Sequence, residues 1–365
     1  MLLCAVPDRH GCRTVHSPTG LGSRFAYGGS SNMIDLKGTK VVVAGGAGFI
    51  GSQMVRELLE LDCSVVVYDN FLHGSPRNLE DIEDRIHVVF GDLLNEWQLA
   101  SAFRTHRPDY VFNFVGDTYV PTAYDMPKRF FDINVEGNLN LLMACKMYDV
   151  KRVLYVSSTE VYGEAQDVPM AENHVLNPLN TYAVSKLASD RLCFTFHAEH
   201  DIPVIIARIY NAYGPRETEP YVIPEIITQL DKSPVVYLGN LDAHRYFTYV
   251  SDTAQGLIAT LCSDIPDGEA VNVGSGITFS IRELTERIGK AMGHDEIDIR
   301  VDERRLRRLD IEMFKCDATK LRNATGWKPT VGLDDGLQRT IEWFRSHGHR
   351  WIWEDRIEGT IRHDE

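Results

Sequence analysis

Three glycines spaced three residues apart, Gly45, Gly48 and Gly51, restrict the fold of this chain more than any other feature. They follow a β-branched run at 40–45 and open an amphipathic stretch at 48–61. In a strand–turn–helix unit, the first glycine permits a tight turn and the second lets a phosphate approach the backbone. The third allows the helix to pack closely on the strand. The helix N-terminus then offers N–H groups and the positive end of its dipole. This pattern predicts a dinucleotide-binding loop.

The loop stands in a longer alternation of strand-like and helix-like segments. Short β-branched runs lie at 40–45, 64–69, 86–91, 110–115, 152–157 and 203–208, with helix-like stretches between them such as 48–61 and 128–148. Continuous apolar runs bounded by turn residues are typical of buried parallel strands. We therefore predict an α/β fold with a doubly wound parallel sheet. After about residue 210 proline and glycine become more frequent, which indicates a second, smaller domain.

Charge and composition exclude several classes of protein. The 365 residues carry a formal net charge of -14, so no general attraction for nucleic acid or anionic lipid is expected. No apolar stretch reaches the ~18 residues of a membrane span. The seven cysteines form an odd, scattered set without a C-x-x-C pair, which predicts reduced thiols in the cytoplasm and no metal site. Residues 1–33 are the exception in charge at net +2, and lack the apolar core of a secretory signal.

Two acidic residues follow later strands of the alternation. Asp69 ends the second strand, near the offset at which a carboxylate grips an adenosine ribose. This acid favours NAD over NADP, because it would repel a 2′-phosphate. Asp92, in Gly91-Asp92-Leu93, either hydrogen-bonds the adenine edge or is an ordinary turn residue.

Tyr182 and Lys186 begin an amphipathic stretch at 181–200, and positions i and i+4 of a helix share a face. An ammonium one turn away and a nicotinamide cation are expected to lower the pKa of the phenol from its ordinary value near 10. Tyr182 would then exchange a proton with a substrate hydroxyl while hydride leaves the same carbon. Lys186 would also hold the nicotinamide ribose. A surface Tyr–Lys pair without chemistry is the alternative.

Together these motifs resemble the extended short-chain dehydrogenase/reductase superfamily, and more narrowly its NAD-dependent nucleotide-sugar epimerase/dehydratase group. The resemblance covers roughly residues 37–345. It also rests on Asn134-Val135-Glu136-Gly137, the segment Ser157–Gly163, Tyr210-Asn211, Tyr213-Gly214-Pro215 and the segment 245–250 that begins with Arg245. It implies a Rossmann-type sheet, bound NAD and a smaller C-terminal substrate-binding domain that clamps a nucleoside diphosphate.

On this basis we expect three segments. Residues 1–36 form a disordered extension. Residues 37–209 form the NAD-binding Rossmann domain, to which 246–275 returns. Residues 210–245 and 276–350 form the nucleotide-sugar-binding domain. The family is often dimeric, and we expect a homodimer built from segments 128–148 and 181–200.

The resemblance also implies which residues bind. The expected cofactor-binding residues are Gly45, Gly48, Phe49, Ile50, Gly51, Asp69, Asn70, Asp92, Leu93, Phe114, Val115, Tyr182 and Lys186. The expected substrate-binding residues are Thr118, Asn211, Arg245, Arg307 and Arg308. Arg245 would neutralise a phosphate. Within the basic cluster at 300–308 the sequence does not choose between Arg307 and Arg308, and a solvated charged surface is the alternative for most of it.

The reaction depends on Ser158-Thr159-Glu160. By resemblance, NAD oxidises the sugar at C4 and Ser158 hydrogen-bonds the sugar oxygen. The pair Thr159-Glu160 resembles the hydroxyl–Glu pattern of GDP-mannose dehydratases and UDP-glucuronate decarboxylases, whereas epimerases have small or unreactive residues there. In a dehydratase the carboxylate removes the C5 proton. Tyr246, after Arg245, fits neither the Asp of epimerases and many dehydratases nor the small residue of decarboxylases.

We therefore expect a nucleotide-sugar 4,6-dehydratase, with Ser158, Thr159, Glu160, Tyr182 and Lys186 as catalytic residues. A UDP-glucuronate decarboxylase and a 4-epimerase are the alternatives within the family, and a non-catalytic NAD-binding scaffold is the remote one. Relatives usually read His-x-Ala-Ala in the segment that this chain has at 113–118, so the nicotinamide side of the pocket is expected to be unusual.

Overall fold

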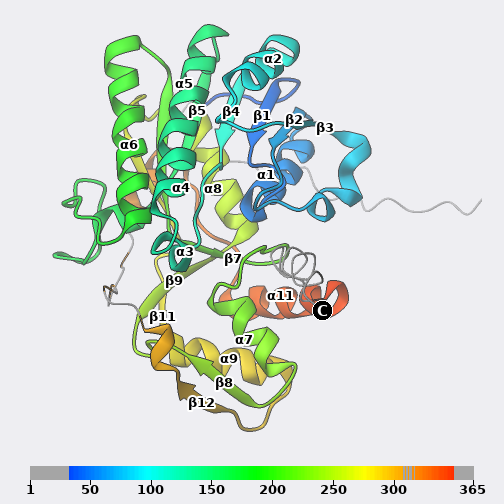
Figure 1. The fold of residues 1–365 in the computed structure, drawn as a ribbon, viewed down its shortest axis with the longest axis vertical. Coiled ribbons are helices and arrows are strands. Elements are labelled where there is room, and N and C mark those ends of the chain that lie inside the picture. Colours follow the sequence, from blue (N-terminus) through cyan, green and yellow to red (C-terminus); the bar gives the residue numbers. More distant parts are fainter. Residues whose placement is uncertain (1–32, 307–308, 310, 312–314, 316, 349–365) are drawn as a thin grey trace, which may run out of the picture.

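A seven-stranded parallel sheet forms the centre of the structure, a computed structural model that describes residues 33–306, 309, 311, 315 and 317–348 (Figure 1). The strands are β1 (Lys40–Ala44), β2 (Ser64–Asp69), β3 (His87–Phe90), β4 (Tyr110–Asn113), β5 (Arg152–Ser158), β6 (Val204–Ile209) and β10 (Ala270–Val273). Their order is β10-β6-β5-β4-β1-β2-β3, and every neighbouring pair is parallel. The strand order reverses between β1 and β4, and ligands of such sheets bind at this switch point. The doubly wound fold predicted from the sequence is confirmed.

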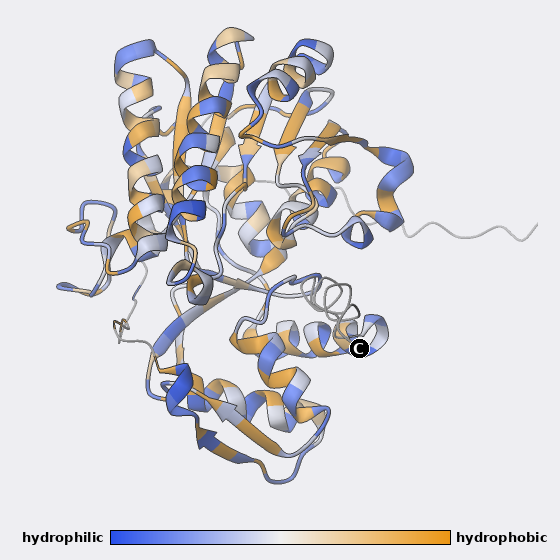
Figure 2. Cartoon of the chain, in the orientation of Figure 1, coloured by the Kyte–Doolittle hydropathy of each residue, from blue (hydrophilic) through white to orange (hydrophobic). Residues whose placement is uncertain are grey.

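Helices cover both faces of this sheet. On one face lie α1 (Phe49–Glu60), α8 (Val250–Cys262) and α10 (Thr319–Thr325); on the other lie α2 (Glu96–His106), α5 (Gly137–Met147) and α6 (Thr181–His200). Successive side chains of a strand point to opposite faces. Accordingly Val41 and Val43 pack with α1 and α8, and Val42 packs with α2 and α5. Both faces are thus buried except at the edge strand β3, which is mostly exposed, and the central strands appear as apolar arrows in Figure 2.

The second part of the chain packs below the carboxyl ends of the strands in Figure 1. It contains the sheet β11-β9-β7 (Thr278–Ser280, His244–Tyr249 and Asn211–Tyr213) and the pair β12-β8 (Asp298–Val301 and Val235–Leu238). Its helices are α7 (Val222–Leu230), α9 (Ile281–Met292) and α11 (Leu333–His347), which enclose a separate apolar core. Among the described residues, no helix combines the length and apolar composition needed to cross a membrane.

Two details differ from the sequence prediction. Residues 33–36, grouped above with the extension, belong to the fold, because Leu36 is buried and the N–H of Ile34 donates to the carbonyl of Cys262 at 3.0 Å. The stretch 128–148 is not one α-helix but α4 (Pro127–Phe131), a π-helical turn (Asp132–Glu136) and α5. The short helix α3 (Val120–Ala123) precedes it. Residues 1–32 lie outside the described residues.

Candidate active site

The glycine loop opens one end of a pocket of about 440 Å³ that runs between the two parts of the chain. Gly45 has a φ of 78°, in the left-handed region that only glycine adopts readily. A Cβ on Gly51 would lie 2.1 Å from the carbonyl oxygen of Gly45, so the third glycine allows α1 to start directly against the loop. Gly48, Phe49 and Ile50 complete this wall. The loop therefore has the shape that the sequence predicts for a pyrophosphate site.

The acidic residues after β2 and β3 line the same end of the pocket. The Asp69 carboxylate accepts backbone N–H groups from Ala47 and Phe71, each at 2.8 Å. Burial raises its pKa, and these two bonds oppose the rise. The Asn70 amide donates to Asp92 at 2.8 Å. Asp69 thus fixes the glycine loop as well as facing the pocket. Leu93, Phe114 and Val115, also predicted from the resemblance, line the cavity.

Tyr182 and Lys186 lie in the first two turns of α6, and both line the pocket. The Lys186 ammonium donates to the carbonyl of Val156 at 2.7 Å and lies 4.9 Å from the ring centre of Tyr155. Burial lowers the pKa of Lys186 to about 8. Burial raises the pKa of Tyr182, and its hydrogen bond with Ser158 only partly offsets this. The direction for Tyr182 is opposite to our expectation, because desolvation is the largest effect and the nearby charge of Glu160 adds to it.

The segment after β5 places two of its three predicted catalytic residues in the pocket. Ser158 and Glu160 line it. The Ser158 hydroxyl accepts the N–H of Glu160 at 3.2 Å, and the Asn180 amide donates to the Glu160 carboxylate at 2.9 Å. Thr159 is only 5% exposed and is absent from the pocket lining, because the 3₁₀ turn Thr159–Tyr162 directs it inward. The structure thus brings Ser158, Glu160 and Tyr182 together without Thr159.

The other end of the pocket belongs to the second part of the chain. Asn211, at the start of β7, and Arg245, on β9, line it as predicted. An Arg245 Nη1 donates to the carbonyl of Ile311 at 2.6 Å. Arg307 and Arg308 lie outside the described residues. Their neighbour Arg305 lines the pocket and pairs with Glu225 at 2.9 Å, although the sequence did not single it out.

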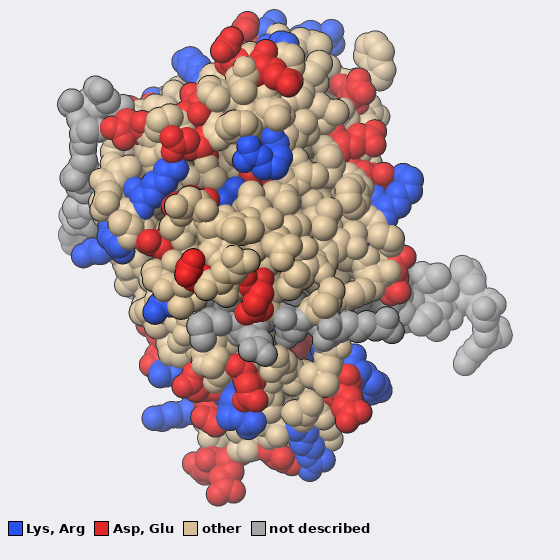
Figure 3. All heavy atoms as spheres, turned by 90° about the vertical axis from the view of Figure 1, so that its left-hand side faces the viewer, with Lys and Arg blue, Asp and Glu red and all other residues tan. Residues whose placement is uncertain are grey.

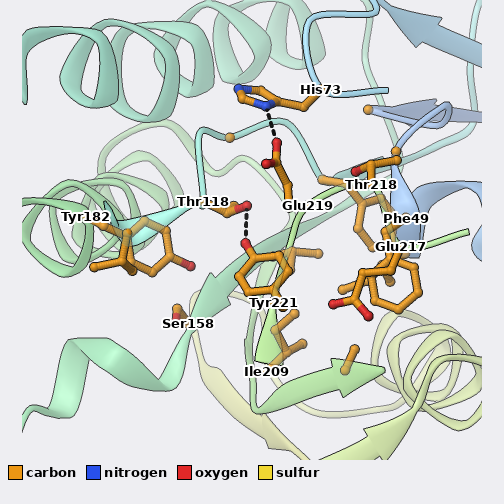
Figure 4. A pocket seen from close by; sticks show the side chains of 18 of the residues that line it. Phe49, His73, Thr118, Ser158, Tyr182, Ile209, Glu217, Thr218, Glu219 and Tyr221 are labelled. Carbon is orange, nitrogen blue, oxygen red and sulfur yellow. Dashed lines mark hydrogen bonds and ion pairs between the residues drawn. The ribbon is translucent and has the colours of Figure 1, made fainter. Parts of the chain in front are cut away.

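Sequence reasoning missed a polar wall that faces the catalytic residues. Glu217, Glu219 and Tyr221 come from the loop between β7 and α7 and line the pocket. Figure 4 shows Tyr221 and Glu219 lying between Tyr182 on one side and Phe49 on the other. Thr218 lines the pocket as well, and the Tyr221 N–H donates to the Glu219 carbonyl at 2.7 Å, so the segment turns tightly and no simple alternation in the sequence marks it.

The unusual segment 113–118 supports this wall from the Rossmann side. The Thr118 hydroxyl, predicted to bind substrate, lies 2.9 Å from the Tyr221 hydroxyl. Asp117 is fully buried, and its carboxylate lies 2.7 Å from Arg129 Nε. Arg129 in turn contacts His73, whose Nδ1 lies 2.8 Å from the Glu219 carboxylate. Through Asp117 and Thr118, this segment therefore connects a charged network to the pocket.

Comparison with known proteins agrees with this geometry. The family model of GDP-mannose 4,6 dehydratase matches residues 42–340. The chain belongs to the NAD-dependent nucleotide-sugar epimerase/dehydratase family. Among curated relatives of this family, the low-salt glycan biosynthesis protein Agl12 of Haloferax volcanii is 34% identical over 83% of this chain and 98% of its own. The dTDP-D-glucose 4,6-dehydratase of Homo sapiens is 30% identical over 86% of this chain and 91% of its own.

A solved family member has the same architecture. The dTDP-glucose 4,6-dehydratase DesIV of Streptomyces venezuelae, crystallised with NAD and TYD bound, superimposes with a TM-score of 0.80 at 30% identity. The match covers 86% of this chain and 99% of that one. Relatives at 30% identity also include a putative UDP-glucose 4-epimerase of Methanocaldococcus jannaschii and a UDP-N-acetyl-alpha-D-glucosaminuronate decarboxylase of Bacillus cytotoxicus. Membership of the family therefore leaves the reaction open.

Proposed function

We propose that this protein is a NAD-dependent nucleotide-sugar 4,6-dehydratase. The observation that carries the proposal is the place of Glu160, whose carboxylate lines the pocket that Ser158 and Tyr182 also line and is held by the Asn180 amide. A carboxylate in this position is suited to removing a proton from carbon next to a ketone. An enzyme that only oxidises and reduces one carbon has no need of such a base.

The pocket fits NAD. The glycine loop leaves no space for a Cβ at Gly51, Asp69 faces the adenosine end, and Lys186 is fixed at the other end. When bound, NAD supplies the acceptor and donor of hydride. The protein's own task is then to orient the sugar, exclude water and move protons.

Each proton has an assigned residue in this proposal. Tyr182 takes the proton of the sugar 4-hydroxyl, with Ser158 hydrogen-bonded to both the phenol and the sugar oxygen. Glu160 takes the C5 proton, which a 4-ketone acidifies, and gives it to the C6 hydroxyl, which leaves as water. C5 regains a proton from solvent when the hydride is restored at C6, and Tyr182 returns its own proton to solvent. Thr159 has no part, because it does not line the pocket. Asn211 and Arg245 bind the diphosphate at the far end, where Arg245 supplies positive charge.

Product mass tests the reaction directly. The protein is incubated with dTDP-glucose, UDP-glucose, GDP-mannose and UDP-glucuronate in turn. Loss of water supports the dehydratase; loss of carbon dioxide or an unchanged mass with altered stereochemistry refutes it in favour of the decarboxylase or the epimerase. Glu160→Gln should abolish both loss of water and exchange of the C5 proton with D₂O. The control is Asp167→Asn, which removes an exposed carboxylate from the following loop and should leave both intact.

We also propose a homodimer formed through α4, α5 and α6. These helices expose large apolar side chains: Phe131, Met143, Met147, Val184 and Phe194 are each at least 40% exposed. The side of the molecule that carries α6 shows a broad area without Lys, Arg, Asp or Glu in Figure 3. The domain boundaries and the cytoplasmic location given above remain predictions.

A further inference from the structure

The loop at 217–221 makes a wall of three hydrogen-bonding side chains opposite the catalytic residues. Glu217, Glu219 and Tyr221 alternate with Thr218 and Pro220, and Tyr221 has extended backbone angles of -64° and 170°. This wall comes from the second part of the chain, whereas Tyr182 comes from the Rossmann part. A sugar held between the two parts must meet both.

Two members of the wall are already engaged by residues of the Rossmann part. The Tyr221 hydroxyl is hydrogen-bonded to Thr118, and the Glu219 carboxylate contacts His73 at 2.8 Å. These contacts fix the wall in place. They also leave Glu219 with a partner when no ligand is bound.

Glu217 differs from its neighbours. Glu217 is only 6% exposed, and its Oε2 is buried without a hydrogen-bond partner among the described residues. In Figure 4 its carboxyl group points into the pocket beside Phe49. Burial, and then the charge of Glu219, raise its pKa well above the ordinary value. A buried carboxyl without a partner is unfavourable, so a ligand that supplies a donor is bound more tightly.

The surroundings of Glu217 restrict what that ligand carries. Glu160 receives only a neutral amide donor and Glu217 receives none among the described residues, so a further carboxylate near them meets carboxyl groups that no cation compensates. Among the described lining residues, His73 is paired with Glu219 and Arg305 with Glu225. Lys186 and Arg245 are hydrogen-bonded to backbone carbonyls, which leave their charge available, and the proposed function assigns them to NAD and to the diphosphate. A diphosphate can use the arginines at the far end, whereas His73, the described cation that contacts the wall, is already paired with Glu219.

We propose that Glu217 selects the sugar: it accepts a hydrogen bond from a hydroxyl of a neutral hexose and excludes a hexuronic acid. This inference rests on the proposed function, in which the substrate is a nucleotide sugar, and adds the residue that separates the two sugar classes. Sites built around a buried polar group discriminate by leaving that group unpaired, or opposed by a like charge, when the wrong ligand binds.

Matched ligands that differ only at C6 provide the test. Dissociation constants are measured by calorimetry for UDP-glucose, UDP-glucuronate and UDP, and for the corresponding dTDP ligands, with NAD present. The wild-type protein should prefer the hexose over the uronate by at least about 100-fold. Glu217→Gln, which keeps the shape of the side chain, should reduce that preference at least about tenfold and leave the affinity for the nucleoside diphosphate unchanged. Glu217→Met should weaken binding of the hexose.

Two controls keep this test decisive. Glu286→Gln removes an exposed carboxylate on α9 and should change none of these constants. Thermal melting checks folding, and Glu217→Gln should melt at or above the wild-type temperature, since it removes an unpartnered buried carboxyl. An unchanged hexose-to-uronate preference in Glu217→Gln overturns the proposal. So does a change confined to NAD affinity, which assigns Glu217 to the cofactor.

Failure of the Glu217 proposal can be distinguished from failure of the proposed dehydratase function. If the wild-type protein binds the hexose with a Glu217-dependent preference but only epimerises it, the dehydratase proposal fails and Glu217 keeps its role. If it releases carbon dioxide from UDP-glucuronate, both fail.

Discussion

Replacing the buried Lys186 with methionine should make the cofactor-free protein more stable while it removes activity. Lys186 is 3% exposed, and its pKa is lowered from 10.5 to about 8 by burial. Each tenfold change in proton affinity corresponds to about 1.4 kcal/mol, so the charged ammonium costs the folded state about 3 kcal/mol at pH 7. Methionine fills a similar volume without this cost.

Part of the gain is lost with the contacts that Lys186 makes. Its bond to the Val156 carbonyl and its position over Tyr155 together contribute about 1–2 kcal/mol. The net stabilisation expected for Lys186→Met is thus about 1–2 kcal/mol. In a chain of this size that corresponds to a rise in melting temperature of about 2 °C at pH 7.

The pH dependence tests the cause of the effect. The unfolded state binds more protons than the folded state between the folded pKa of about 8 and the unfolded value of 10.5. Stability of the wild-type protein therefore rises with pH across this window, and the advantage of Lys186→Met declines by about 3 kcal/mol. Urea unfolding of protein stripped of NAD, at several pH values, measures both curves. Lys290→Met, at an exposed site on α9, serves as the control. Parallel curves for wild type and Lys186→Met would refute the reasoning, as would a destabilised variant at pH 7.

Three further predictions concern the reaction, the loop and the assembly. Tyr182→Phe should lower kcat by about 10²–10⁴-fold with NAD affinity retained, measured by product formation and calorimetry; a near-normal rate assigns the proton transfer elsewhere. Gly51→Ala should destabilise the protein by about 1–3 kcal/mol and abolish NAD binding, because its Cβ meets a backbone carbonyl oxygen at 2.1 Å, whereas Gly332→Ala, with open space, should do neither. The double substitution Met143→Glu and Phe194→Glu should give a monomer in light scattering. A wild-type protein that is already monomeric would contradict the proposed dimer.

The sheet could be predicted because its signal is local. Each of the six strands predicted from β-branched runs is present. Five of them are largely buried, as strands covered on both faces are, whereas β3 at the edge of the sheet is mostly exposed. The glycine loop is equally local, because three close approaches within seven residues require glycine at fixed positions. The sequence did not predict that 128–148 breaks into α4, a π-helical turn and α5. A single π-helical turn changes the spacing of the apolar residues too little for the sequence pattern to reveal it.

The site residues that the sequence predicted correctly are those that belong to a recognisable motif. Tyr182, Lys186, Ser158 and Glu160 reach the pocket, whereas Thr159 is buried away from it, because a motif gives the order of the residues and not which side chains face the cavity. The pKa direction of Tyr182 was wrong for a related reason. Sequence spacing gives the neighbouring charge but not the loss of water, and burial is the larger effect.

Whether a part of this pocket accepts a charged ligand group depends on which of its acidic side chains already have hydrogen-bond donors. The chain is acidic overall at -14, yet both inferred ligands are anionic diphosphates. Asp69 accepts two backbone N–H groups and Glu219 contacts His73, so neither confronts a ligand as an unpaired charge. Glu217 has no such donor among the described residues, and Glu160 receives one from Asn180. In the proposed function the phosphates bind where N–H groups and arginines lie, and the sugar binds where carboxyl groups still need donors. Net charge cannot reveal this division, because it depends on pairing between segments that are far apart in the sequence.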